Sequence, residues 1–461
     1  MPTFEAKSVM PVSVQELFAW HSRPGAFERL APPWEDIRII EKQGGIEDGA
    51  RLVMVIAKGP VQVRWEALHR DYIDGQQFRD EQVHGPFSRW VHTHRFVDNG
   101  AQQSTLDDSV DYQLPFGGAA QLMAGGNTHR MIKRMFEHRH NRTRNDLARH
   151  AKFADRPKQR VAITGASGLI GSQLAAFLKT GGHRVDSMVR NPDTAQGTDI
   201  VWNPQSGHVD LQALEGVDAV VHLAGENIAG GRWTEARKRR VLDSRVKGTK
   251  TIAEAISSLT NKPKVLIVAS AIGFYGARGD EVLSEESGPG DGYLTEVCRA
   301  WEEAARPAEE AGIRVVKLRI GIVLSAAGGA LATMLPAFKV GVGGVVGSGQ
   351  QYMSWIALDD VVGLVHHVLM TDDLRGVLNA TAPNPVTNRE FTKTLGRVIR
   401  RPTVLPLPSF AIKAMFGEMG DTLLLQGSRV LPKRAEQAGF EFLHPELEGA
   451  LRAELGLASE A

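Results

Sequence analysis

Val161-Ala162-Ile163-Thr164-Gly165-Ala166-Ser167-Gly168-Leu169-Ile170-Gly171 is the stretch that decides the fold of this chain. An apolar run leads into three glycines that stand three residues apart, and a run typical of a helix follows over residues 172–178. In this arrangement Gly165 permits a tight turn, Gly168 lets a pyrophosphate approach the backbone, and Gly171 lets helix and strand pack closely. The anion then accepts hydrogen bonds from N–H groups at the N-terminus of the helix.

The surrounding sequence favours a dinucleotide site over the alternative, a glycine-rich turn without a ligand. A glycine spacing alone is a weak signal, but here a strand precedes the loop, a helix follows it, and a second strand is predicted over residues 184–189. We therefore expect the cofactor to contact the loop at Gly165, Ser167, Gly168, Leu169, Ile170 and Gly171.

The end of the second predicted strand indicates which dinucleotide binds. NAD sites usually place a carboxylate on the ribose about 20 residues after the loop, whereas NADP sites offer an arginine to the 2′-phosphate. Asp186 has about that spacing, but it lies early in the strand, and ligands bind beyond the carboxyl ends of parallel strands. Arg190 stands at that end, so the sequence favours NADP with Arg190 as the phosphate partner. The alternative interpretation is that Arg190 binds no phosphate and is an ordinary exposed arginine at the end of a strand.

Length and composition limit the class of protein. A chain of 461 residues predicts two or three domains, and a formal net charge of +1 gives no general attraction to nucleic acid or to anionic membranes. The single cysteine, Cys298, allows no disulfide within the chain and is typical of a reducing compartment. No apolar run has the length of a membrane span, and residues 1–5 lack the features of a signal peptide. We expect a cytoplasmic protein.

Residues 1–150 predict an α+β domain. Apolar and polar residues alternate, as in strands with one buried face, over residues 51–56, 61–67, 89–96 and 107–114. A long helix follows, with Met131, Ile132, Met135 and Phe136 on one stripe. Antiparallel strands followed by a long helix make an α+β layout, and residues 151–159, which are charged and contain a proline, predict a linker.

Residues 160–400 predict a doubly wound α/β domain. Its strands are almost continuously apolar, as a parallel sheet covered on both faces requires. Strands are predicted over residues 217–223, 265–270 and 315–319, and helices over residues 236–258 and 295–311. Three prolines, Pro402, Pro406 and Pro408, then precede a small C-terminal domain, residues 401–461.

The region around the end of the long helix is strongly basic, since residues 130–160 hold eleven Lys and Arg. Nucleic-acid binding is one interpretation, but an apolar stripe needs a core and no aromatic residues alternate with the basic ones, so a solvated helix face is favoured. The spacing of His129, His138, His140 and His150 does not place three ligands and a carboxylate on one face. We expect these histidines at the surface and predict no metal site.

The chain resembles the extended short-chain dehydrogenase/reductase superfamily. Within it, the chain is similar to a subfamily of nucleoside-diphosphate-sugar epimerases that is sometimes labelled a cell-division inhibitor. The resemblance covers about residues 160–455 and rests on residues 164–171, 222–228, 232–234, 244–245, 269–276, 319–324, 347–351 and 354–360. Residues from about 405 are similar to the small C-terminal domain of this subfamily. Residues 1–150, with segments 21–30 and 32–34, resemble START-type helix-grip domains, which hold hydrophobic ligands between a curved sheet and a long helix.

The resemblance implies roles for particular residues. Leu223, Ala224 and Gly225 would lie at the end of the fourth strand, beneath the adenosine and ribose of the cofactor. Ser270 would hydrogen-bond the reacting carbonyl. The alternative role for Ser270 is structural, as a hydroxyl that caps a helix or lies in a loop. Tyr293 stands at the position of the acid/base tyrosine, but Val297 replaces the lysine expected four residues later. Without a nearby cation a phenol keeps a pKa of about 10 and is a poor base at neutral pH.

Three functions stay open at this point. The first is an NADP-dependent reductase or epimerase of a small carbonyl or sugar-nucleotide substrate. The second is a cofactor-binding regulatory protein whose chemistry has lapsed, which the loss of the lysine favours. The third is a carrier of an apolar ligand in the N-terminal domain, with the second domain as a redox sensor. Four further residues could contribute to an unusual site: Arg245, Tyr275, Glu302 and Glu303.

Overall fold

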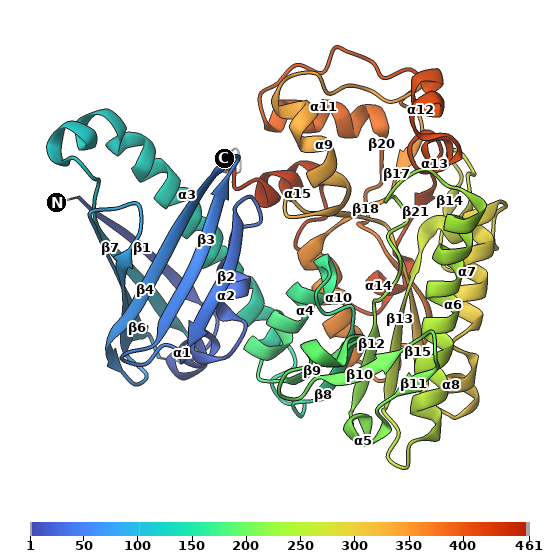
Figure 1. Cartoon of the computed structure of the whole chain (residues 1–461), viewed down its shortest axis with the longest axis horizontal. Helices are drawn as coiled ribbons and strands as arrows, with labels where there is room; N and C mark the ends of the chain where they lie inside the picture. Colours follow the sequence, from blue (N-terminus) through green and yellow to red (C-terminus); the bar gives the residue numbers. More distant parts are fainter. Residues whose placement is uncertain (1, 101, 458–461) are drawn as a thin grey trace. The chain divides into compact units, whose positions relative to one another are not determined.

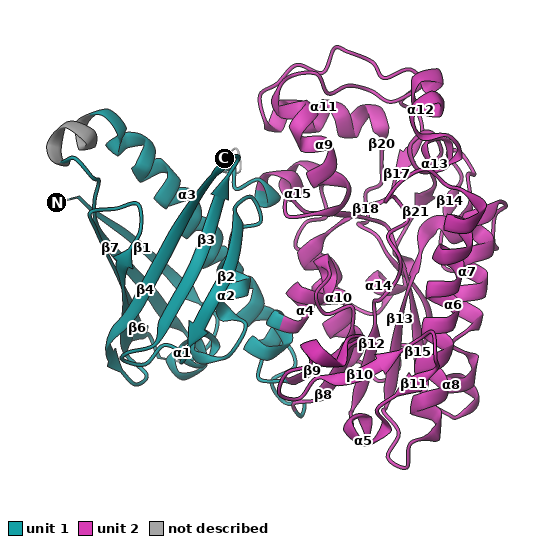
Figure 2. Cartoon of the chain, in the orientation of Figure 1, with its two compact units in different colours: residues 1–157, 176–183, 453–461 teal, residues 158–175, 184–452 magenta. Residues whose placement is uncertain are grey.

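A computed structural model describes residues 2–100 and 102–457, without the side chains of residues 117–122. The chain forms two compact units (Figure 2). Unit 1 comprises residues 1–157, 176–183 and 453–461, and unit 2 comprises residues 158–175 and 184–452.

Unit 1 is built on one antiparallel sheet of seven strands in the order β1-β7-β6-β5-β4-β3-β2. The strands are β1 (Thr3–Met10), β2 (Asp36–Gln43), β3 (Arg51–Lys58), β4 (Val61–Ile73), β5 (Gln77–His84), β6 (Arg89–Asp98) and β7 (Ser104–Gln113). Alternate residues of β7 are buried, because successive side chains of a strand point to opposite faces. Each of the four strands predicted in this region forms.

Three helices complete unit 1: α1 (Val14–Ser22), α2 (Ala26–Leu30) and the long α3 (Gly117–Ala151) (Figure 1). Ile132 and Phe136 of α3 are fully buried and join one apolar cluster with residues of the sheet such as Trp65. Met135 is half-buried beside them, whereas Met131 is 42% exposed. The sheet and its long helix make the helix-grip arrangement predicted for residues 1–150.

Unit 2 is built on an eight-stranded sheet in the order β11-β10-β9-β8-β12-β13-β15-β19. The strands are β8 (Arg160–Thr164), β9 (Arg184–Val189), β10 (Ile200–Asn203), β11 (His208–Val209), β12 (Ala219–His222), β13 (Val265–Ala271), β15 (Arg314–Ile320) and β19 (Gly376–Ala380). Only the β10–β11 pair of this sheet is antiparallel. The predicted doubly wound parallel sheet is confirmed.

Helices cover the sheet of unit 2. They are α4 (Leu169–Thr180), of which residues 176–180 belong to unit 1, α5 (Leu211–Leu214), α6 (Glu235–Ser258), α7 (Tyr293–Glu303), α8 (Arg306–Glu310), α9 (Gly329–Lys339), α10 (Leu358–Met370) and α11 (Asn388–Val398). α6, α7 and α8 lie along one face of the sheet (Figure 1), where Ile252 and Trp301 pack in one apolar cluster with Leu266 of β13. Burial on both faces explains why the central strands are apolar throughout.

The strand order reverses at β8, which lies between β9 and β12. In open α/β sheets, ligands bind outside the carboxyl ends of the strands at such a reversal. The glycine loop, residues 165–171, leaves the carboxyl end of β8, and residues 223–225 leave that of β12. The fold therefore brings these two segments to the same edge of the sheet.

The C-terminal residues form a small helical region, as predicted, with α12 (Ser409–Phe416), α13 (Glu418–Gly420), α14 (Lys433–Gln437) and α15 (Leu447–Glu454). In this region β21 (Arg429–Val430) pairs in parallel with β14 (Val282–Leu283). Residues up to 452 belong to unit 2, so the boundary at residue 401, like those at residues 150 and 160, stays a prediction. None of the described helices combines the length and the apolar composition that crossing a membrane requires.

Candidate functional site

The glycine loop has the backbone geometry that a close approach requires. Gly165 has a φ of +69°, in the left-handed region that favours glycine. A Cβ on Gly171 would lie 2.1 Å from the carbonyl oxygen of Gly165, so only glycine allows this helix to sit so close to the strand. A Cβ on Gly168, which is exposed, would meet only that same oxygen at 3.2 Å. The geometry fits the predicted roles of turn, helix packing and ligand approach.

The start of α4 supplies the other half of an anion site. Because the helix begins at Leu169, the N–H groups of its first turn have no acceptors within the helix. Ser167 is exposed just before this turn, and Leu169 and Ile170 are half-buried in it. A pyrophosphate placed here would accept hydrogen bonds from these N–H groups in the favourable field of the helix dipole.

Thr164 joins the glycine loop to the segment after β12. Its hydroxyl oxygen accepts hydrogen bonds from the N–H groups of Leu223 at 3.1 Å and Ala224 at 3.2 Å, and it lies 2.7 Å from Nδ1 of His222. Burial lowers the pKa of His222 to about 4, so its ring is neutral near pH 7 and Nδ1 can accept the hydroxyl proton. Residues 223–225, which are predicted to lie beneath the cofactor, are thereby held beside Gly165.

Arg190 follows the last residue of β9 and is exposed at the carboxyl end of that strand. It forms no ion pair with any residue that the structure describes. Asp186, by contrast, is fully buried, 2.5 Å from Nε of Arg160 and 3.2 Å from Nε of Arg184. Asp186 is therefore occupied inside the sheet, and the charged group left at the strand end is that of Arg190.

Ser270 lies near the carboxyl end of β13, but its side chain belongs to a buried ionic network. Its hydroxyl donates to Oε1 of Glu302 on α7 at 2.7 Å, and the residue is 3% exposed. Glu302 accepts two hydrogen bonds from Arg319 on β15, both of 2.8 Å. A substrate carbonyl could bond the Ser270 hydroxyl only after the bond to Glu302 is broken.

Arg319 extends the network to the neighbouring strand. Its guanidinium lies 3.3 Å from the ring centroid of Phe274 and donates to the hydroxyl of Tyr275 at 3.1 Å. That hydroxyl donates in turn to Oδ1 of Asn379 on β19 at 2.8 Å. A satisfied buried network of this kind is rigid, so it fixes the ends of β13, β15 and β19 relative to one another. Glu303 is not part of the network, since it is exposed and pairs with Arg306.

Tyr293 is the first residue of α7 and is half-buried. Its hydroxyl donates to the backbone carbonyl of Lys238 on α6 at 2.8 Å. Burial raises the pKa of Tyr293 above its usual value, although the positive charges of Arg245 and Lys238 act in the opposite direction. The phenol is therefore protonated at neutral pH, when it can donate a proton but is a poor base. Val297, one turn further on, is 2% exposed.

Arg245 on α6 provides a cation on the Tyr293 side of the site. Its Nη1 donates to the backbone carbonyls of Glu226 at 3.0 Å and Val241 at 3.2 Å, and its guanidinium lies 4.8 Å from the ring centroid of Trp301. A Cβ on Gly225 would lie 3.5 Å from this guanidinium. Since no described carboxylate pairs with Arg245, its charge is available to an anionic group of a cofactor or substrate.

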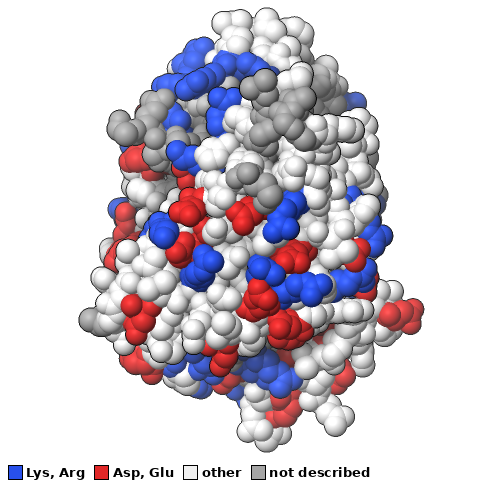
Figure 3. Space-filling view, turned by 90° about the vertical axis from the view of Figure 1, so that its left-hand side faces the viewer, with Lys and Arg blue, Asp and Glu red and all other residues white. Residues whose placement is uncertain are grey.

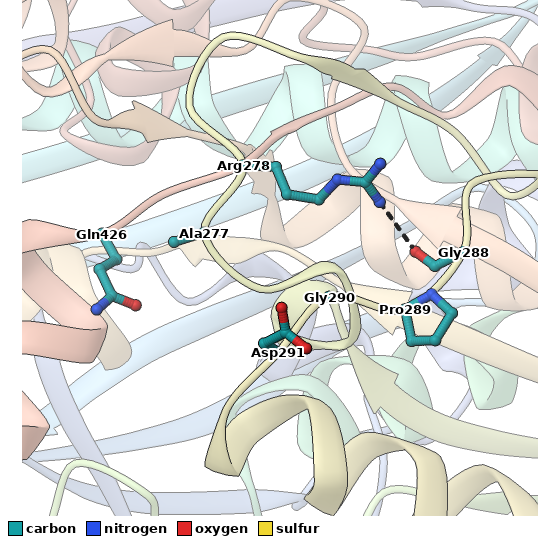
Figure 4. A pocket seen from close by; sticks show the side chains of 7 residues that line it. All are labelled: Ala277, Arg278, Gly288, Pro289, Gly290, Asp291 and Gln426. Atoms are coloured by element: carbon teal, nitrogen blue, oxygen red, sulfur yellow. Dashed lines mark hydrogen bonds between the residues drawn. The ribbon is translucent and has the colours of Figure 1, made fainter.

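A polar pocket of about 490 Å³ lies close to Tyr293 in the sequence. It is lined by Ala277, Arg278, Gly288, Pro289, Gly290, Asp291 and Gln426 (Figure 4). Arg278 crosses this pocket to donate to the carbonyl of Gly288 at 3.2 Å, and the carboxylate of Asp291 is exposed. The mixture of charged and backbone polar groups suits a hydroxyl-rich molecule better than an apolar one.

Unit 1 contains a larger pocket of about 800 Å³ between its sheet and α3. Its wall is mostly apolar and includes Phe27, Leu30, Met54, Ile56, Trp65 and Met135. Several charged side chains, such as Arg134 and Arg139, also line it, and at one place Asp80, His92 and His94 lie together. Such a pocket suits an apolar molecule with a polar group at one end.

The prediction that the histidines of α3 lie at the surface is wrong for two of them. His140 and His150 are 3% and 5% exposed, and Nε2 of His140 lies 2.8 Å from Oδ2 of Asp108. Arg139 and Arg142 are also half-buried, so the helix contacts protein over more than its one apolar stripe. The face shown in Figure 3 carries Lys and Arg interspersed with Asp and Glu.

The polar residues that come together in the unit 1 pocket were not among the predicted site residues. The signal was present as His92-Thr93-His94 within a predicted strand, because residues two apart in a strand project from the same face. The pairing of this strand with those holding Asp80 and Asp108 could not be foreseen, since it depends on register across three strands.

Three family models match the chain. The NAD dependent epimerase/dehydratase family matches residues 161–380, and the polyketide cyclase / dehydrase and lipid transport family matches residues 10–140. A domain of unknown function matches residues 407–454. The three matches follow the order of the sheet-and-helix unit, the parallel sheet and the small C-terminal region.

Known proteins resemble the chain in both units. An epimerase family protein of Mycobacterium bovis is 47% identical over 291 residues, which make up 63% of this chain and 96% of that protein. The crystal structure of a nucleoside-diphosphate sugar epimerase from Corynebacterium glutamicum has a TM-score of 0.81 and 32% identity, covering 98% of this chain and 90% of that one. Human epimerase family protein SDR39U1 (isoform 2), crystallised with NADPH, has a TM-score of 0.59 and 36% identity, covering 64% of this chain and 98% of that one.

Proposed function

The chain belongs to the epimerase family of extended short-chain dehydrogenases/reductases, and from this premise we propose that it binds NADP(H) and acts as an oxidoreductase or epimerase on a small carbonyl or sugar-nucleotide-like substrate. The observation that carries the cofactor choice is Arg190, exposed at the carboxyl end of β9, while Asp186 is buried in ion pairs. The human relative crystallised with NADPH supports the same choice.

The cofactor would lie across the strand reversal at β8. Its pyrophosphate would face the glycine loop and the first turn of α4, and its 2′-phosphate would pair with Arg190. Leu223, Ala224 and Gly225 would support the adenosine and ribose, because Thr164 holds this segment beside the loop. NADPH, when bound, supplies a hydride to a carbonyl carbon.

Within the chain, Tyr293 is the proton donor that we propose for this reduction. Its raised pKa keeps the phenol protonated at neutral pH, so the group can donate a proton in the reduction. In the structure that proton points at the carbonyl of Lys238, so the hydroxyl must rotate toward the substrate. Arg245 would stabilise the phenolate left after the transfer, since its charge already acts on Tyr293.

For Ser270 the geometry supports a positioning role more than direct contact with a carbonyl. Its hydroxyl is committed to Glu302, which holds Arg319 and through it Tyr275. We therefore propose that Ser270 helps to hold the ends of β13 and β15 in place. Turnover would be slow and biased toward reduction at neutral pH, because no strongly activated base is at hand.

A second function rests on the replacement of the lysine by buried Val297. If the chemistry has lapsed, the protein is an NADP(H)-binding sensor or a ligand carrier that responds to cofactor redox state. In either case we propose that the pocket of unit 1 takes a mostly apolar molecule, as its lining favours. We also keep the cytoplasm as the proposed compartment, since the one cysteine, Cys298, is buried and unpaired.

Two experiments test the proposal. NADPH oxidation is followed with a library of small carbonyl compounds and sugar nucleotides, using wild type and Tyr293→Phe. The purified full chain is also denatured and its released small molecules identified by mass spectrometry. Turnover that Tyr293→Phe abolishes supports the enzyme, whereas cofactor binding without turnover of any compound favours the sensor.

A further inference from the structure

The polar part of the unit 1 pocket is formed by three neighbouring strands. His92 and His94 stand two residues apart on β6 and so project from the same face. Asp80 of β5 lies directly across from His92, and Asp108 of β7 lies directly across from His94. The sheet register therefore gathers two imidazoles and two carboxylates at one place.

Three of these side chains have the spacing of metal ligands. Asp80, His92 and His94 each offer a ligand atom, and these atoms lie within 4.8 Å of one another. Oδ2 of Asp80 is 2.9 Å from Nδ1 of His92 and 3.5 Å from Nε2 of His94. Two nitrogen or oxygen ligands of one tetrahedral metal ion lie about 3.3 Å apart, which follows from metal–ligand bonds of about 2.0–2.1 Å.

Asp108 occupies the place of an outer carboxylate that orients metal-binding histidines. Its Oδ1 lies 2.7 Å from Nδ1 of His94 and 3.3 Å from Nε2 of His92, which are the ring nitrogens opposite those that face Asp80. His140 holds the other oxygen of Asp108 at 2.8 Å. Histidine ligands of metals commonly donate their second N–H to such a carboxylate, which fixes tautomer and ring orientation.

The contacts on the Asp108 side of the two rings are short but misaligned. Nε2 of His92, Nδ1 of His94 and Oδ1 of Asp108 are buried atoms without a hydrogen bond of acceptable geometry to any described group, in spite of their short separations. His92 and Asp108 are each 2% exposed. These three atoms lie on the ring edges away from Asp80, so an ion bound beside Asp80 would not contact them; small rotations of the rings would align them with Asp108, as a carboxylate behind metal-binding histidines requires.

We propose that Asp80, His92 and His94 bind one divalent transition-metal ion at the polar end of the unit 1 pocket. Two imidazoles and one carboxylate suit Zn²⁺ or Fe²⁺, and three protein ligands leave coordination positions open. Because the three residues line the unit 1 pocket, those positions would take water or an oxygen atom of the bound molecule. The ligand class is then an apolar molecule that carries a carboxylate, hydroxyl or keto oxygen. This site is separate from the cofactor chemistry proposed for unit 2.

The competing account is an ion-pair cluster without metal, in which a protonated His92 lies between Asp80 and Asp108. Although burial favours the neutral ring, Asp80 and Asp108 together raise the pKa of His92 to about 9. One imidazolium and the nearby Arg139 would then offset the two carboxylates. The two accounts differ in what happens when metal is supplied. If the site binds metal, the ring nitrogens that face Asp80 are deprotonated and the binding of added metal saturates. The ion-pair cluster has no affinity for a divalent cation.

The test uses the full chain after treatment with a chelator. Zn²⁺ binding is measured by calorimetry, and Co²⁺ binding by the visible absorption of the bound ion. Wild type should bind one equivalent of each, and His94→Asn and Asp80→Asn should weaken binding by at least about 100-fold. Asp108→Asn should weaken it about 10–100-fold, as loss of an outer carboxylate does. The matched control is His84→Asn, an exposed histidine on β5, which should bind as wild type does.

Two results would overturn the site. One is a wild-type chain that shows neither a Zn²⁺ titration nor a Co²⁺ absorption band, which favours the ion-pair cluster. The other is binding that His94→Asn and Asp80→Asn leave unchanged, which would place the metal elsewhere. Circular dichroism verifies that each variant is folded. If a variant is not folded, the Co²⁺ spectrum of wild type tests the site instead, because it shows whether nitrogen atoms coordinate the ion. NADPH binding should be the same in all variants, so the result does not depend on the function proposed for unit 2.

Discussion

The hydroxyl of Ser270 donates to Glu302 at 2.7 Å, and the same carboxylate forms a two-point ion pair with Arg319. The hydroxyl of a serine expected to meet a substrate carbonyl is thus committed to a neighbouring carboxylate. Breaking a buried ion pair on one side leaves an uncompensated charge, so each member of this trio stabilises the other two.

Ser270→Ala should therefore act on stability more than on chemistry. Loss of one hydrogen bond to a buried charged group costs about 1.5–3 kcal/mol in the free energy of unfolding. Glu302→Gln should cost more, about 3–5 kcal/mol, because it leaves the Arg319 charge without its counter-ion. Denaturant unfolding measures both values. A loss of reductase rate by about 10²-fold or more in Ser270→Ala with unchanged stability would instead assign the hydroxyl to the reacting carbonyl.

Gly168→Asp should abolish NADPH binding while the protein stays folded. The added Cβ meets only one backbone oxygen, at 3.2 Å, but the carboxylate would occupy the pyrophosphate position and repel it. Fluorescence enhancement of NADPH measures binding, and thermal unfolding monitors the fold. The matched control is Gly449→Asp, where a Cβ has no neighbour within 4 Å. Binding of NADPH by Gly168→Asp as by wild type would mean that the loop is only a turn.

Gly171→Ala should damage the fold itself, since its Cβ would lie 2.1 Å from the carbonyl oxygen of Gly165. Overpacking of this kind costs about 1–3 kcal/mol or more. The free energy of unfolding in denaturant checks this. A variant as stable as wild type would show that α4 and β8 are not packed closely enough to exclude a Cβ at residue 171.

Tyr293→Phe should lower a detectable reductase rate by about 10²–10⁴-fold, the usual contribution of a positioned proton donor. The pKa of Tyr293 is raised above its normal value, so the donor form is fully populated throughout the neutral range. Titration of Tyr293 should therefore not change the rate of reduction below about pH 10, and the rate should fall above that pH. Arg245→Gln should move that fall to higher pH. A Tyr293→Phe variant that turns over at the wild-type rate would place the donor elsewhere.

Stability should depend on pH through His222. Its folded pKa of about 4 lies below the value of 6.5 expected for an exposed histidine, so between these limits the unfolded chain binds one more proton than the folded chain. Stability due to this group is present above pH 6.5 and is lost as the pH falls toward 4, by about 1.4 kcal/mol per pH unit. His222→Asn should remove that part of the slope, whereas His208→Asn, at an exposed position, should leave it unchanged. Identical slopes in the two variants would contradict the burial of a neutral His222.

Sequence patterns of short range predicted most of the fold. The alternating strands of unit 1, the apolar strands of unit 2 and the glycine loop are local features, and the positions of Arg190 and of residues 223–225 follow from the direction of parallel strands. Contacts between distant segments could not be predicted. The bond from Ser270 to Glu302 depends on how α7 packs against β13. The burial of His140, which continues the face of Ile132 and Phe136, depends on its contact with Asp108 of β7.

Calorimetric titration of the full chain with NADPH and with NADH tests the central claim most directly. A charge-assisted contact between Arg190 and the 2′-phosphate contributes about 1.5–3 kcal/mol, so wild type should prefer NADPH by about tenfold or more. Arg190→Ala should lose that preference, while Arg184→Ala, at the opposite end of β9, should keep it. Equal affinities of wild type for the two cofactors, or a preference that survives in Arg190→Ala, would contradict the account.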